Sequence, residues 1–216
     1  MLHEITVAVV EGHRGDLPRR ARAHHRDHHR YSDTPRDIHS PLHGGALWSH
    51  AGWILSPHFA KTRLEAVPDL AAFPELVWLD RRHWLAPVAL GLLCGAFGAQ
   101  ILVWGFFVST TLLYHGTFTV NSLAHLFGSQ PFDTSDDSRN NALVAALTLG
   151  EGWHNNHHRY PGATKQGIAP HELDLAWWGL RVLSAAGLVW DLKETPYEET
   201  SRHTRRPARG LLEPAA

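Results

Sequence analysis

The stretch of sequence that decides the fold is WLAPVALGLLCGAFGAQILVWGFFVSTTLLYHGTFTVNSLAHLFGSQPF, residues 84–132, which contains no Asp, Glu, Lys or Arg. One helix over this stretch would be about 70 Å long, more than twice the thickness of the hydrocarbon core of a bilayer. The chain should therefore fold back on itself, and Gly95 and Gly98 mark the turn. We predict a membrane hairpin over about residues 84–120, with a shorter arm Trp84–Cys94 and a longer arm Ile101–Val120. The alternative is a buried helical hairpin in a soluble core.

Basic residues on both sides of this stretch predict its orientation. Lys61, Arg63, Arg81 and Arg82 precede it, Arg139, Arg159 and Lys165 follow it, and the turn carries none. Because Lys and Arg gather on the cytoplasmic side of membrane proteins, both flanks should be cytoplasmic. We expect an integral membrane protein with its polar regions on that side.

The remaining sequence predicts helices and no strands. Short apolar segments at 47–55 and 142–149 and an amphipathic pattern at 172–192 favour an all-α protein, in which a cytoplasmic helical cap covers the membrane hairpin. We divide the chain into an atypical N-terminal segment (1–22), one catalytic domain (23–196) and a loose tail (197–216). A single cysteine, Cys94, excludes a disulfide framework, and a net charge of -1 argues against nucleic acid as a partner.

A repeated histidine motif indicates the chemistry. HRDHHRY at residues 25–31 returns as HNNHHRY at residues 154–160, in a chain with 18 histidines. On an α-helix, the three imidazoles of H-x-x-H-H project within one sector about 100° wide, which makes a cluster of metal ligands. Between the two copies, Asn121 and His125 lie one helical turn apart at the inner end of the predicted membrane arm. The first cluster alone would also fit a metal-scavenging tract.

Seven clustered histidines without a usable sulfur suit two metal ions, but imidazole binds zinc, copper, iron and nickel alike. The position of the cluster favours one of these metals. A site at the inner face of a membrane hairpin is accessible to a lipid tail, and cleaving its C–H bonds requires iron that activates O2. The other histidines are expected to be surface, interfacial or supporting residues: His39, His43, His50, His58, His83, His115, His171 and His203.

Four motifs together resemble those of the integral-membrane acyl-CoA (stearoyl-CoA type, delta-9) fatty acid desaturases. They are HRDHHRYSDTPRDIHSP at 25–41, SHAGW at 49–53, NSLAHLFG at 121–128 and GEGWHNNHH at 150–158, and the likeness extends from about Ala23 to Pro196. The resemblance implies O2-dependent formation of a cis double bond in a saturated acyl chain at two iron ions. It implies that the iron ligands are His25, His28, His29, His125, His154, His157 and His158, that Asn121 holds a water, and that Asp37, Glu151 and Asn155 orient the imidazoles.

The resemblance also implies the partners. The substrate would be an acyl-CoA or an acyl-lipid in contact with membrane lipid. Electrons would come from a ferredoxin, a rubredoxin or a cytochrome b5-like protein docking near Arg139 and Arg159, because the sequence has no Gly-rich dinucleotide motif.

The sequence departs from the family before residue 23. That family begins with another membrane hairpin and a histidine box H-x4-H, and residues 1–22 match neither. We expect that the recorded start lies downstream of the true one or that the protein is a shortened homologue, and that the chain as written is inactive or nearly so. Two alternatives remain open, a hydroxylase on the same scaffold and a non-catalytic metal-binding remnant.

Overall fold

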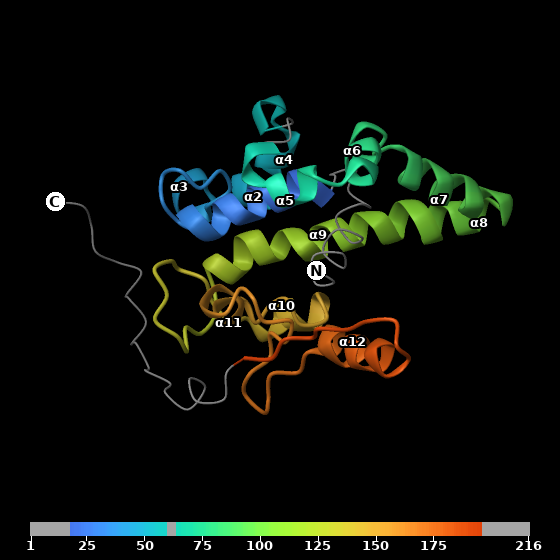
Figure 1. Ribbon diagram of the computed structural model, residues 1–216. Helices are drawn as coiled ribbons and strands as arrows, with labels where there is room; N and C mark the ends of the chain where they lie inside the picture. Colours follow the sequence, from blue (N-terminus) through green and yellow to red (C-terminus); the bar gives the residue numbers. More distant parts are fainter. Residues whose placement is uncertain (1–17, 60–63, 196–216) are drawn as a thin grey trace. The chain divides into compact units, whose positions relative to one another are not determined.

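The computed structural model describes residues 18–59 and 64–195, and its regular secondary structure is helical (Figure 1). Within those ranges no strand forms, although Asn140 makes isolated β-bridges with Ser129 and Trp153. The helical character predicted from the sequence is confirmed. The predicted tail 197–216 and residues 1–17 of the predicted N-terminal segment lie outside the described residues.

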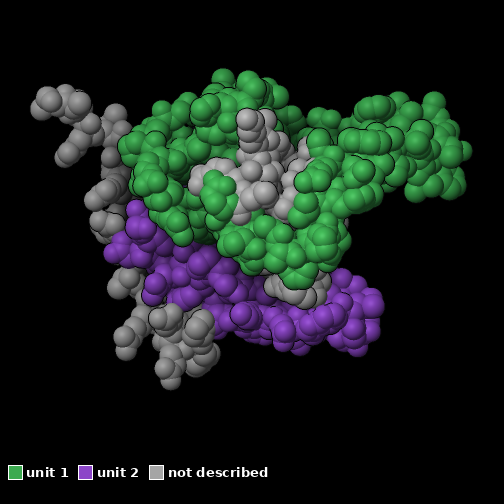
Figure 2. Space-filling model, turned by 45° about the horizontal axis from the view of Figure 1, so that its top comes forward, with its two compact units in different colours: residues 1–121 green, residues 122–216 purple. Residues whose placement is uncertain are grey.

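The chain divides into two compact units, Met1–Asn121 and Ser122–Ala216, which Figure 2 shows in green and purple. In the first unit, the long helix α2 carries the first histidine cluster and packs against the short helices that follow it. The buried apolar side chains of this unit include Ala23, Trp53 and Val67. Up to residue 81 the described elements of this unit are α2 (Pro18–Tyr31), α3 (Pro41–Gly44), η1 (Trp48–Gly52), α4 (Trp53–Leu55), η2 (Pro57–Phe59), η3 (Leu64–Ala66), α5 (Pro68–Ala71) and α6 (Pro74–Arg81).

The apolar stretch forms two helical segments separated by a short turn. Helix α7 (Leu85–Ala96) ends at Phe97, and Gly98 adopts φ 112°, a left-handed conformation that favours glycine. The chain then continues through α8 (Ala99–Ile101), η4 (Leu102–Val108), α9 (Ser109–Ser122) and η5 (Leu123–His125). Helix α7 packs against η4, where Gly91 faces the ring of Phe106. The turn therefore lies inside the segment that the sequence predicted.

One helical run in the described residues, Ala99–His125, is long and apolar enough to cross a membrane, whereas α7 is shorter than a usual span. Large apolar side chains along both segments are exposed, including Leu92 (71%), Trp104 (69%) and Leu112 (67%). Exposed apolar surface of this extent is typical of a face that contacts lipid or a partner. It does not fit the buried-core alternative. That the pair forms a membrane hairpin stays a prediction.

In its described residues, up to 195, the second unit has three further helices joined by long loops: α10 (Ala142–Leu147), α11 (His154–Arg159) and α12 (Leu175–Ala185). The side chain of Asn141 caps α10 by accepting from the amides of residues 143 and 144, and Asp174 caps α12 by accepting from the amide of Trp177. Helix α12 is shorter than the predicted 172–192, because Asp174 starts it and Gly187, at φ 72°, follows its end.

Candidate metal centre

The first histidine cluster lies on α2 as the helical spacing predicts. His25 and His29 are one turn apart, and their Nε2 atoms approach to 3.1 Å. His28 is buried beside them, with its ring 5.8 Å from that of His29. The helix therefore presents all three imidazoles to one region of the first unit.

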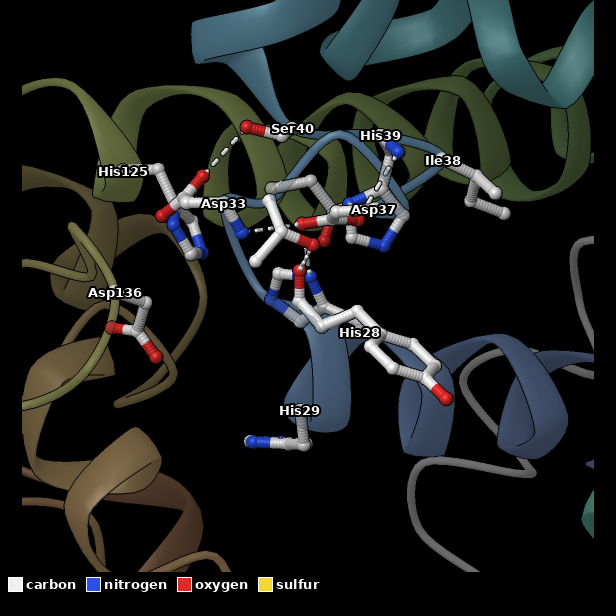
Figure 3. Close-up of polar contacts among 12 residues, drawn as sticks. His28, His29, Asp33, Asp37, Ile38, His39, Ser40, His125 and Asp136 are labelled. Carbon is white, nitrogen blue, oxygen red and sulfur yellow. Dashed lines mark hydrogen bonds and ion pairs between the residues drawn. The ribbon is translucent and has the colours of Figure 1, made fainter.

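Asp37 fixes the orientation of the His28 ring (Figure 3). Its carboxylate accepts a hydrogen bond from Nδ1 of His28 at 3.0 Å and from the backbone amide of Asp33 at 3.0 Å. Burial alone would raise the pKa of Asp37, but the hydrogen bond from His28 and the charges of His39 and His28 hold that pKa well below its usual range. An ionised Asp37 keeps the hydrogen of His28 on Nδ1, so Nε2 is the atom available to a metal.

His39, which the sequence left among surface, interfacial or supporting residues, is buried in this group. Its ring lies 4.4 Å from that of His28, and its backbone amide donates to Asp37. His28, Asp37 and His39 each offer a ligand atom within 4.8 Å of the others. His39 could have been found from the sequence, because it follows Asp37 by two residues and Asp37 was already predicted to orient an imidazole ring.

The second cluster joins α11 to His125 at the end of η5. Nε2 of His154 lies 3.0 Å from Nε2 of His125 and 3.0 Å from Nε2 of His158. One hydrogen on His154 cannot bridge to both neighbours at full strength, whereas a metal ion accepts lone pairs from all three nitrogens. Two nitrogens bound at about 2.1 Å to the same ion lie about 3.0–3.4 Å apart, so these separations fit a shared ion.

A second carboxylate, Asp136, supports this cluster, and the sequence reasoning missed it. Nδ1 of His158 lies 2.7 Å from Oδ2 of Asp136, whose other oxygen accepts from the backbone amide of Ser138. Asp136 belongs to the polar loop between His125 and the second motif, where the first acidic residues after the uncharged stretch appear. That position was the only sequence signal, because loop residues follow no periodicity.

The other predicted residues have varied environments. Asn155 is fully buried, and its side-chain amide hydrogen-bonds to the loop 132–138 that carries Asp136. It accepts from the backbone amide of Phe132 and donates to the hydroxyls of Thr134 and Ser138. Glu151 is partly exposed in the turn before α11. Asn121 lies in the last turn of α9, where its backbone carbonyl accepts from the hydroxyl of Ser49 at 2.8 Å.

Each unit thus brings together some of the predicted ligands. The first unit holds His25, His28 and His29 with Asp37, and the second holds His125, His154, His157 and His158 with Asp136. Imidazoles and carboxylates, many of them buried, are a donor set that fits a transition metal. That the ligands of the two units form one metal site stays a prediction.

Comparisons with known proteins identify the chain's family. The model of the family described as "Fatty acid desaturase" matches residues 15–191. A palmitoyl-monogalactosyldiacylglycerol delta-7 desaturase of Arabidopsis thaliana is 40% identical over 174 residues, which cover 78% of this chain and 46% of the relative. An sn-2 palmitoyl-lipid 9-desaturase of Nostoc is 39% identical over 178 residues, covering 80% and 62%.

An icosanoyl-CoA 5-desaturase of Limnanthes douglasii is 37% identical over 179 residues, covering 79% of this chain and 49% of the relative. The chain therefore spans about half the length of the curated relatives it matches. The names of these relatives include both lipid-linked and CoA-linked substrates, so they do not single out the acyl-CoA delta-9 type. The match to the family model nevertheless covers both histidine motifs and the apolar stretch between them. The chain belongs to the fatty acid desaturase family.

Proposed function

We propose that this protein is an O2-dependent fatty acyl desaturase that introduces a cis double bond into a saturated acyl chain at a di-iron site. The observation that carries the proposal is the meeting of three imidazole Nε2 atoms, from His125, His154 and His158, in a member of the desaturase family. Two bound iron ions would supply the reduction of O2 and the removal of two hydrogens from adjacent methylenes.

The proposed ligands come from both units. We assign the iron-holding role to His25, His28, His29, His125, His154, His157 and His158, with Asn121 holding a water. Asp37 and Asp136 would keep the hydrogens of His28 and His158 on Nδ1, so that Nε2 of each ring carries the lone pair that binds the metal.

The substrate is proposed to be an acyl chain carried by CoA or by a lipid. The four sequence motifs favour a delta-9 acyl-CoA, whereas the relatives named above include enzymes for lipid-linked chains. The exposed apolar run Ala99–His125 supports contact with membrane lipid. We keep the cytoplasmic placement of the histidines as part of the proposal, although some relatives are named chloroplastic.

An external electron donor remains part of the proposal. Arg159 is exposed and could contact an acidic ferredoxin, rubredoxin or cytochrome b5-like surface. Arg139 is less suited, because its side chain is only 16% exposed and lies 3.7 Å from Asp137. Docking is therefore expected to depend more on Arg159.

Metal content tests the ligand assignment without requiring turnover. We expect the detergent-purified chain to hold iron, and His28→Ala and His157→Ala each to lower the iron-to-protein ratio measured by mass spectrometry, because each removes an imidazole donor. His58→Ala and His171→Ala are matched controls, since both histidines are exposed and outside the clusters, one in each unit. Unchanged iron in His28→Ala and His157→Ala would refute the assignment.

The identity of the product tests the reaction. In a desaturase-deficient host supplying O2 and reductant, any product that depends on His157 should be an acyl chain two hydrogens lighter than its precursor. A hydroxylated chain would instead establish the hydroxylase. Iron binding with no product from the chain, even when extended by a family-like first box and hairpin, would establish a metal-binding remnant.

A further inference from the structure

Helix α11 is held in place by the side chain of Asn156, a residue of the second histidine motif that is not among the predicted site residues. This amide is 1% exposed and accepts a hydrogen bond from Nδ2 of Asn140 at 2.7 Å. Its own Nδ2 donates to the backbone carbonyl of Gln166 and to Oε2 of Glu172, both at 2.8 Å. Asn156 therefore connects the metal-ligand helix to the loop that follows it.

Glu172 is the centre of this network. Its two oxygens accept four N–H groups, each at 2.8 Å: the side-chain amides of Asn140 and Asn156 and the backbone amides of Ile168 and Ala169. All four donors are neutral amides, so an ionised carboxylate satisfies every one of them and a neutral side chain of the same size would not. Glu172 thereby ties α11 to both the bridge residue Asn140 and the loop 166–174.

We infer that Glu172 is a positioning residue for the metal centre, acting through Asn156 on α11. A helix of only six residues has little stability of its own, so its orientation depends on its contacts with the residues around it. His154, His157 and His158 all project from this helix, and a small rotation would displace all three rings at once. The inference rests on the proposed role of these histidines in holding metal.

Asp174 provides a matched control, because it is a second carboxylate that accepts hydrogen bonds from the loop 166–174. Asp174 accepts from the backbone amides of Gln166 (2.7 Å) and Gly167 (3.2 Å) and from the amide of Trp177. These hydrogen bonds reach the loop and α12 rather than α11. Loss of Asp174 should therefore weaken the loop without turning the histidine helix.

The test is titration of the full, metal-stripped chain with Co²⁺, read by the visible absorption bands that report ligand geometry. Glu172→Gln places an N–H₂ group against at least one N–H donor, so we expect about 10-fold weaker Co²⁺ binding and altered bands. Asp174→Asn should lower the thermal stability but leave the bands and the affinity close to those of the wild type. Glu172→Asp, which keeps the charge, should fall between the wild type and Glu172→Gln.

When Glu172→Gln folds, either of two results would overturn the inference. In one, folded Glu172→Gln, checked by circular dichroism, binds Co²⁺ with wild-type affinity and bands. In the other, Asp174→Asn disturbs the bands as much as Glu172→Gln, which would make both residues merely structural. If Glu172→Gln does not fold, Glu172→Asp with wild-type affinity and bands overturns it. If His157→Ala leaves Co²⁺ binding unchanged, the proposed metal site is wrong. The inference about Glu172 is then wrong as well, because it depends on that site.

Discussion

In α2 the Nε2 atoms of His25 and His29 lie 3.1 Å apart, and in α11 those of His154 and His158 lie 3.0 Å apart. The two copies of the motif thus reproduce the same ring pair, one helical turn apart. Their carboxylates differ. Asp37 contacts the middle histidine of the first copy, His28, whereas Asp136 contacts the last histidine of the second copy.

The residues between the histidines differ even more. In the first copy, Arg26 is partly exposed and makes two hydrogen bonds to Asp69, each at 2.7 Å. In the second copy the corresponding residue is Asn155, which is fully buried and bonds the loop 132–138. At this position the 14-residue helix α2 is held by a partly exposed ion pair, and the six-residue α11 is held by a buried amide. The same motif can therefore be kept in shape by two different kinds of support.

This difference predicts unequal costs for removing the two supports. Asn155→Ala should lower the free energy of unfolding by about 2–3 kcal/mol, because it leaves the buried amide of Phe132 without its acceptor. Arg26→Ala should cost no more than about 1 kcal/mol, because its ion pair with Asp69 is partly solvated. Denaturant unfolding of the metal-free protein measures both. An equal or larger loss for Arg26→Ala would show that the proposed contrast between the copies is wrong.

A smaller effect is expected from acid. The pKa of Asp37 is depressed in the folded protein, so its contribution to stability is present above its unfolded pKa of about 3.9 and is lost as the pH falls below that value. Between pH 5 and pH 3 the metal-free wild type should lose about 1 kcal/mol more than Asp37→Asn. Unfolding curves at a series of pH values check this. Parallel losses in the two proteins would mean that Asp37 titrates as an ordinary exposed carboxyl.

Much of the local structure could be predicted from the sequence, because it depends on periodicity and on glycine. The turn near Gly98, the helix over residues 142–147 and the shared face of each H-x-x-H-H motif follow from these rules. The predicted apolar face of α12 was only partly right. Trp177 and Leu180 are buried, but Leu183 is 43% exposed.

The supports of the site were mostly beyond prediction. His158 and its partner Asp136 are 22 residues apart, and Asn156 and its partner Glu172 are 16 apart, each pair joined by irregular loops. A carboxylate in such a loop has no spacing rule that identifies its partner. The role of Asp37 was predictable, because Asp37 closely follows the first motif and the family resemblance implies that it orients an imidazole ring.

The central claim is that the histidines of both copies hold the same pair of ions. Mössbauer spectroscopy of the chain loaded with ⁵⁷Fe tests it most directly, on the wild type, on His28→Ala and on His157→Ala. If the two copies share the ions, either substitution alone should change the spectrum of all the iron that remains bound. If each variant instead keeps a fraction of iron with the unaltered wild-type spectrum, the copies form separate sites and the claim is contradicted.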